Sequence, residues 1–136
     1  MHGSEPVEWA RLLSVPVFKA FHIEVDGESA SAVKEATRAG YHSIGLLDTV
    51  VGTGAGAMSG GAGKTFDWSV AGRLIESRGE GFPRLPIILA GGLDAGNVVG
   101  AIEQVRPWCI DVSGGVETDR VKDYGKIREF VRLVKE

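Results

Sequence analysis

Glycines cluster directly after two consecutive apolar runs, and their spacing suggests a chemical role. Gly91 and Gly92 follow the run 87–90, and the segment Ser113-Gly114-Gly115 follows the run 109–112. Because glycine has no Cβ, backbone N–H groups beside it can approach and point at phosphate oxygens. The alternative is that these glycines only form tight turns between strands and helices. One glycine doublet alone favours the turn interpretation. With two doublets after consecutive strands, phosphate binding and simple turns are about equally expected.

Two aspartates stand near the ends of predicted strands. Asp48 ends the apolar run 43–48, so its carboxyl group would lie at the mouth of a pocket, partly withdrawn from water, where it could act as a general acid. Alternatively, Asp48 is solvated or caps the following turn. Asp111 lies among apolar residues, where a charge must be hydrogen-bonded or serve a site. For Asp111 the structural and functional interpretations stay open.

The segment 50–65, VVGTGAGAMSGGAGKT, is too long and too rich in glycine for a simple connection. A phosphate-binding P-loop would need glycine at position 58, where Met58 stands. A dinucleotide fingerprint would need a helix opening at once and an acid about 20 residues on, and neither is present. We therefore expect a mobile glycine-rich lid over a substrate.

Cysteine, histidine and tryptophan offer little further chemistry. Cys109 shares strand parity with Asp111 but lies roughly 7 Å further from the strand end, so we expect it to be buried. His22 is expected on the surface or in packing. Core or interface packing is expected for the three tryptophans: Trp9, Trp68 and Trp108.

The elements that must position these residues alternate between strands and helices, which predicts an α/β fold with a parallel sheet. Strands are expected at 15–25, 43–48, 87–90 and 109–112, and helices at 29–38, 68–77, 95–104 and 124–134. The helix caps are expected at Ser29, Asp67, Asp94 and Asp123. Such a sheet is either open and doubly wound or part of a (βα)8 barrel. In both, the chemistry lies at the carboxyl ends of the strands.

Side-chain periodicity predicts which faces of two elements are buried. Alternation along 15–25 places Lys19 on the same face as four apolar residues, Val17, Phe21, Ile23 and Val25. Helical spacing in 124–134 predicts an inward face, made of Ile127, Phe130, Val131 and Val134.

Composition restricts the classes of protein. The 136 residues predict one domain spanning 1–136, with 43% hydrophobic and 24% charged residues and a mean hydropathy of +0.04. A formal charge of −3 supplies no basic field for nucleic acid. No apolar run reaches the roughly 20 residues that cross a bilayer, and the polar start is unlike a secretory signal, so we expect a cytoplasmic protein without membrane contact. The single cysteine predicts no internal disulfide. The three histidines have no regular ligand spacing, so we expect no structural metal.

Four motifs in order, LLDT, GGAGKTFDW, PIILAGGLDAGNV and IDVSGGVETDRVKD, make the sequence resemble phosphoribosylanthranilate isomerases. It is most similar to the isomerase domain of fungal multifunctional tryptophan biosynthesis proteins. The resemblance implies a (βα)8 TIM barrel that converts N-(5-phosphoribosyl)anthranilate to 1-(2-carboxyphenylamino)-1-deoxyribulose 5-phosphate by an Amadori rearrangement. This is an aldose-ketose isomerisation, an intramolecular oxidoreduction, and it implies a phosphorylated small-molecule substrate and no cofactor.

The resemblance also implies roles for particular residues. Asp48 matches the general acid that protonates the ribose ring oxygen. The other matches are expected to bind substrate or phosphate: His2, Gly61, Gly63, Lys64, Gly91, Gly92, Asp111, Ser113, Gly114 and Gly115.

The family's first half has no counterpart in these residues. Met1-His2-Gly3 matches the end of the fourth strand, so the chain corresponds to a partial barrel from about the end of strand four through helix eight. The family's general base, a cysteine in a K-I-C-G-like strand, and a substrate-binding arginine are unmatched. We expect a fragment that lacks the base, whose partners would be the missing half-barrel or other domains of a multifunctional protein. The alternatives are a non-catalytic, phosphate-binding half-barrel and a shortened gene model.

Overall fold

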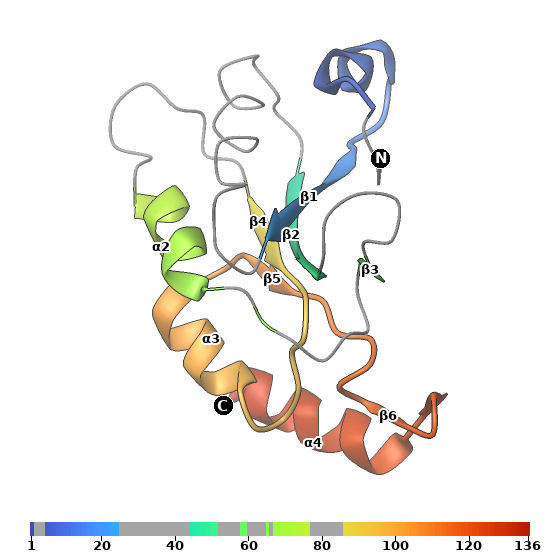
Figure 1. The fold of residues 1–136 in the computed structure, drawn as a ribbon, viewed down its shortest axis with the longest axis vertical. Helices are drawn as coiled ribbons and strands as arrows, with labels where there is room; N and C mark the ends of the chain where they lie inside the picture. The colour runs from blue at the N-terminus through green and yellow to red at the C-terminus, as the bar shows by residue number, and fades with distance from the viewer. Residues whose placement is uncertain (2–4, 25–43, 52–57, 60–64, 66, 77–85) are drawn as a thin grey trace.

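A computed structural model describes residues 1, 5–24, 44–51, 58–59, 65, 67–76 and 86–136 (Figure 1). The predicted helix 29–38 and most of the glycine-rich segment 50–65 lie outside these residues.

A parallel sheet forms the centre of the fold (Figure 1). Its strands are β1 (Phe18–Glu24), β2 (Ile44–Val51), β4 (Ile87–Leu89) and β5 (Cys109–Ile110), in the spatial order β1-β2-β4-β5. All three of these pairings are parallel, which confirms the predicted sheet. The strands of the described chain do not close into a barrel. A short strand, β3 (Met58–Ser59), pairs antiparallel with β2, so part of the segment predicted as a loop is a strand.

Three α-helices follow strands of this sheet: α2 (Trp68–Glu76), α3 (Val98–Val105) and α4 (Tyr124–Lys135). The Asp67 carboxylate accepts from Ser69 N at 2.9 Å, and that of Asp123 accepts from Gly125 N at 2.9 Å, as predicted for caps. The predicted start of α3 at residue 95 is wrong. The Asp94 carboxylate accepts from Gly96 N at 2.8 Å in a turn before the helix, so α3 begins only at Val98.

Two elements have no counterpart in the sequence predictions. The first is a short 3₁₀ helix, η1 (Val7–Leu12), which precedes β1. The second is a hairpin formed by β6 (Glu117–Thr118) and β7 (Val121–Lys122), between β5 and α4.

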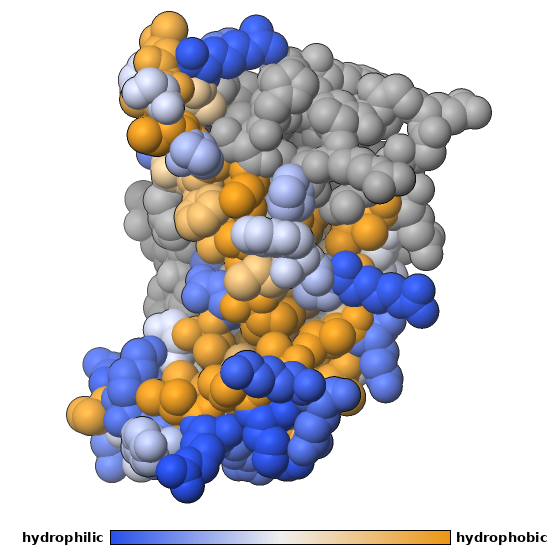
Figure 2. Space-filling view, turned by 180° about the vertical axis from the view of Figure 1, so that it is seen from behind, coloured by the Kyte–Doolittle hydropathy of each residue, from blue (hydrophilic) through white to orange (hydrophobic). Residues whose placement is uncertain are grey.

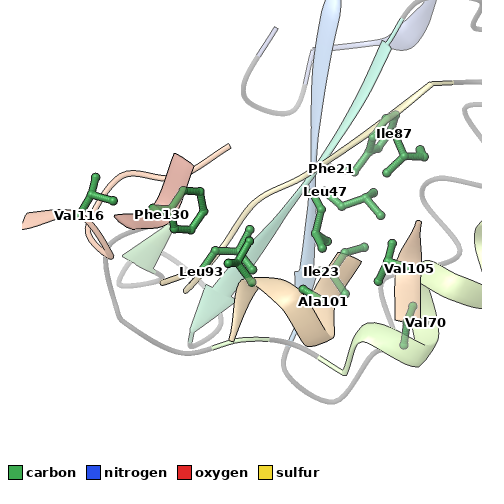
Figure 3. Packing of buried hydrophobic residues seen from close by; sticks show 13 residues of the cluster. Phe21, Ile23, Leu47, Val70, Ile87, Leu93, Ala101, Val105, Val116 and Phe130 are labelled. Atoms are coloured by element: carbon green, nitrogen blue, oxygen red, sulfur yellow. The ribbon is translucent and has the colours of Figure 1, made fainter. Parts of the chain in front are cut away.

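The hydrophobic core lies between one face of the sheet and the helices (Figure 3). Alternate strand residues point to this face and meet α2 and α3: Phe21, Ile23, Leu47, Ile87 and Leu89 from the strands, with Val70, Ala71, Val98, Ala101 and Val105 from the helices. Lys19 shares the parity of Phe21 and is only 4% exposed, as the alternation predicted. Its Nζ lies 3.1 Å from the Glu5 carboxylate, so the buried ammonium is paired.

The predicted inward face of α4 is partly wrong. Phe130 is buried, but Val131 is 43% exposed and Val134 is 37% exposed. Ile127 and Phe130 pack in or against the core as predicted, and Leu133, which was not predicted, also packs against it. Helical spacing identifies which residues of α4 are apolar, but only some of these residues contact the rest of the core.

Two of the three tryptophans, for which core or interface packing is expected, lie outside the core. Trp9 is 56% and Trp108 64% exposed, whereas Trp68 is half-buried against the core. Cys109 is also exposed, contrary to prediction, because β5 is an edge strand of the described sheet. Figure 2 shows hydrophobic side chains gathered over η1 and the start of β1, and hydrophilic ones over α4.

Candidate functional site

A pocket of about 470 Å³ lies at the carboxyl ends of β2, β4 and β5. The sequence predictions placed the chemistry at this edge. Seven predicted site residues line the pocket: Asp48, Gly91, Gly92, Asp111, Ser113, Gly114 and Gly115. The fold therefore brings together residues that are up to 67 positions apart in the chain.

Asp48 reaches the pocket because of strand alternation. Leu47 points into the helix-covered core, so Asp48, the next residue, points to the opposite face of the sheet. Asp48 is 8% exposed, and His22 of β1 is paired with it in register. The strand continues to Val51, so the prediction that Asp48 ends the strand is wrong. Its carboxyl group nevertheless opens onto the pocket.

Gly91 is required by the path of the loop after β4. Its φ of 86° lies in the region that L side chains rarely adopt, and a Cβ there would lie 2.5 Å from Thr49 N. Gly92 has a φ of 66°. The turn interpretation therefore holds at Gly91, because β2 and this loop approach too closely for any side chain. The approach also brings the glycine backbone beside Asp48.

The loops after β4 and β5 are joined directly. Asp94 and Gly115 form an isolated parallel β-bridge, and a Cβ on Gly115 would lie 2.8 Å from the Leu93 carbonyl carbon. The Asn97 amide donates to Gly92 O at 2.9 Å, which holds the first loop against the start of α3. The two glycine clusters thus form one rigid rim.

Ser113 is oriented by a lysine from the hairpin. Lys122 Nζ donates to Ser113 O at 3.0 Å and to Ser113 Oγ at 3.1 Å. The same ammonium forms an ion pair with Glu117 at 2.7 Å. Because Ser113 Oγ accepts from Lys122, its own proton is available to a ligand acceptor in the pocket.

Asp111 lies just beyond the end of β5. The expectation that it lies among buried residues is wrong, because β5 ends at Ile110 and Asp111 is exposed. The register between strands places it level with Ala90, with Asp48 on the far side. Two strand spacings, about 10 Å, therefore separate the backbones of the two aspartates. This separation leaves room for a ligand between them.

Seven further residues line the pocket and were not predicted as site residues: Ala90, Leu93, Asp94, Val112, Glu117, Arg120 and Lys126. Three of them come from the hairpin and the first turn of α4. Lys126 Nζ donates to Glu117 O at 2.6 Å, so its ammonium supports the hairpin. The sequence feature that could have indicated the hairpin is Asp119-Arg120, which stands between two pairs of β-forming residues. This dipeptide has no glycine, so it does not match the usual hairpin turn.

Four predicted site residues, His2, Gly61, Gly63 and Lys64, lie outside the described residues, so their roles stay predictions. In the part of the chain that is described, no three His, Cys, Asp or Glu side chains come together as metal ligands. No helix found there has the length and apolar character to cross a membrane.

The pocket combines carboxyl groups with hydrogen-bond donors. Asp48 and Asp111 could exchange protons with a ligand, while the glycine loops and Ser113 offer donors to an oxyanion. Carboxyl groups and hydrogen-bond donors therefore lie together in one pocket.

Comparison with protein families supports this interpretation. Residues 1–133 match the family model described as N-(5'phosphoribosyl)anthranilate (PRA) isomerase.

Similar proteins carry related names. A multifunctional tryptophan biosynthesis protein of Phycomyces blakesleeanus is 44% identical over 99% of this chain and 18% of its own length. An N-(5'-phosphoribosyl)anthranilate isomerase of Desulforudis audaxviator is also 44% identical, over 99% of this chain and 59% of its own. The solved phosphoribosyl anthranilate isomerase of Thermotoga maritima is 32% identical, with a TM-score of 0.74 over 98% of this chain and 59% of its own.

Proposed function

Because the chain belongs to the N-(5'-phosphoribosyl)anthranilate isomerase family, we propose that it carries the acid and phosphate-binding part of that enzyme's site. The proposed substrate is N-(5-phosphoribosyl)anthranilate, and the product is 1-(2-carboxyphenylamino)-1-deoxyribulose 5-phosphate. The reaction is an aldose-ketose isomerisation in tryptophan biosynthesis, in a cytoplasmic setting. The observation that supports it most is the pocket that joins Asp48 to both glycine loops.

Asp48 is the proposed general acid. A carboxyl group that is 8% exposed and opens onto the pocket can protonate the ribose ring oxygen as the ring opens. The flanking Leu47 and Thr49 are buried on the other face, so the backbone that carries Asp48 is held in place. Asp111, about two strands away, is proposed to contact the substrate.

The glycine loops are proposed to hold the phosphate. Gly92 and Gly114 lie on adjacent loops that the Asp94 to Gly115 bridge joins. Ser113 has a hydroxyl that Lys122 orients at 3.1 Å. Fixed donors of this kind bind an oxyanion with little reorganisation.

The general base is proposed to come from another segment. The described residues that line the pocket include no cysteine, and Cys109 lies two residues before Asp111 on its strand. The chain spans 59% of the length of the Desulforudis isomerase and 18% of the Phycomyces protein. We propose that the described strands are part of a (βα)8 barrel, and that a complementary half-barrel, or other domains of a multifunctional protein, supplies the base.

A second candidate is a non-catalytic module that binds phosphorylated ligands. It is favoured by one observation, that the glycine loops line the pocket while no cysteine of the described chain does. Phosphate binding needs only the loops after β4 and β5, whereas isomerisation also needs a base.

A fluorescence assay for consumption of N-(5-phosphoribosyl)anthranilate separates the two candidates. The 136-residue chain is assayed alone and after mixing with a separately produced N-terminal half of an isomerase, with a whole isomerase as the positive control. We expect turnover only in the mixture. Turnover by the chain alone would contradict the missing base, and a mixed complex without turnover would favour the binding module.

A further inference from the structure

The turn between β6 and β7 carries a side chain where glycine is favoured. The loop has two residues, Asp119 with a φ of 51° and Arg120 with a φ of 64°. Positive φ at both positions is typical of a type I′ turn, for which Asp-Gly and Asn-Gly are the favoured pairs. Asp119 suits its position, but Arg120 stands in the position of the glycine. A long side chain in this conformation is strained.

The strained turn is held firmly in place. Thr118 Oγ1 donates to the Asp123 carboxylate at 2.8 Å, and Asp123 N donates to Val116 O at 2.9 Å. Lys122 ties the hairpin to Ser113 at 3.0 Å. The tip therefore has a fixed position beside the loop after β5, and a change at residue 120 need not disturb the loop itself.

Arg120 lines the pocket, and its guanidinium has no hydrogen bond or ion pair to any described residue. The other pocket cation, Lys126, donates to Glu117 O at 2.6 Å. Arg120 thus offers up to five unused N–H donors, in a planar arrangement that matches phosphate and carboxylate oxygens.

The carboxylates of the pocket lining make a cation favourable for binding an anion there. Four carboxylates line it, from Asp48, Asp94, Asp111 and Glu117. Glu117 is paired with Lys122 at 2.7 Å, so the other three carboxylates would repel an anionic ligand, and Lys126 and the neutral glycine N–H donors offset that repulsion only in part. A further cation in the same lining, Arg120, would offset more of this repulsion.

We propose that Arg120 binds the phosphate of the ligand from the hairpin side of the pocket, opposite the N–H donors of the glycine loops. The inference rests on the proposed function in taking phosphate as the anion. It gives arginine a role in a turn that favours glycine, since the guanidinium supplies a charge that glycine would lack.

Isothermal titration of the chain with inorganic phosphate, paired with thermal unfolding, tests the proposal. Arg120→Gly should bind phosphate about tenfold more weakly, because it loses a charge-assisted hydrogen bond. The same variant should unfold about 4 °C higher, because the turn gains its favoured residue. Arg120→Lys should bind with intermediate affinity, because it keeps the charge but not the planar donor arrangement.

Two matched controls separate charge from strain. Asp119→Gly relieves strain at the neighbouring position and keeps the guanidinium, so its phosphate affinity should not fall. Arg128→Gln removes one positive charge from α4, outside the pocket lining, and should leave affinity unchanged.

Unchanged affinity in Arg120→Gly would overturn the proposal, as would an equal loss in Arg128→Gln or no phosphate binding by the parent chain. Turnover is scored separately. A chain that binds phosphate through Arg120 without isomerising keeps this inference and loses the proposed function. A chain that isomerises, but whose phosphate affinity does not depend on Arg120, keeps the proposed function and loses this inference.

Discussion

Leu47 and Asp48 are neighbours in β2, yet the two faces of the strand give them opposite tasks. Leu47 is fully buried among residues of the strands and helices, whereas Asp48 opens onto the pocket. One face therefore holds the fold together and the other presents polar groups to a ligand. Substitutions at these two adjacent residues should therefore change stability and chemistry separately.

The largest effect is expected on the core face. Leu47→Ala should lower the free energy of unfolding by about 3 kcal/mol, because it removes buried methyl groups and leaves a cavity. Urea denaturation followed by circular dichroism measures the change. Leu46→Ala, on the other face and only half-buried, is the control. An equal loss of unfolding free energy in Leu46→Ala would contradict the distinction between the two faces of the strand.

Asp48→Asn tests the pocket face. We expect kcat of the reconstituted enzyme to fall at least about 100-fold, because the amide cannot donate the proton. The free energy of unfolding and the affinity for phosphate should change little, since the two side chains have nearly the same shape. Turnover close to that of the parent would exclude Asp48 as the acid.

Gly91→Ala tests the close approach between β2 and the loop after β4. A Cβ at a φ of 86° and close to Thr49 N should cost about 2 kcal/mol or more of stability. Gly100→Ala in α3 is the matched control, because its Cβ would meet nothing within 4 Å. That change should stabilise the helix by about 0.5–1 kcal/mol. Similar effects at both glycines would contradict the close approach of loop and strand.

The smallest effect concerns the cap of α4, far from β2. Hydrogen bonds from the Lys126 backbone N–H, from the Thr118 hydroxyl and from the Gly125 N–H hold the pKa of Asp123 below its usual value of 3.8. The cap therefore contributes fully above about pH 3.8 and is lost as the pH falls through the lower folded pKa.

Thermal unfolding of the chain and of Asp123→Ala, measured between pH 2 and pH 7, checks this dependence. The difference in Tm should be a few degrees at neutral pH and should vanish in acid. A difference that stays constant with pH would show that the charge of Asp123 has no part in capping.

Local features of the fold could be predicted from the sequence because they depend on neighbouring residues. Asp67 and Asp123 cap their helices as expected, and the alternation along β1 buries Lys19. The start of α3 was missed because Asp94 bonds to Gly96 in a turn, a choice that composition does not reveal. Exposure of Cys109 depends on which strands lie beside β5, and that is a tertiary property.

The site shows the same division. That Asp48 and the glycine clusters lie in one pocket could be predicted, because parallel strands place their carboxyl ends at the same edge of a sheet. Arg120 and Lys126 were not, because the hairpin that carries Arg120 has strands of two residues and a turn without glycine. Only the folded chain brings these cations to the pocket.

We propose that the pocket face of the sheet binds a phosphorylated ligand through the glycine loops. Amide NMR of the ¹⁵N-labelled chain, titrated with 1-(2-carboxyphenylamino)-1-deoxyribulose 5-phosphate, tests it most directly. We expect the amides of Gly92, Ser113 and Gly114 to shift first and together. The absence of binding, or largest shifts over η1 on the exposed apolar surface, would contradict it.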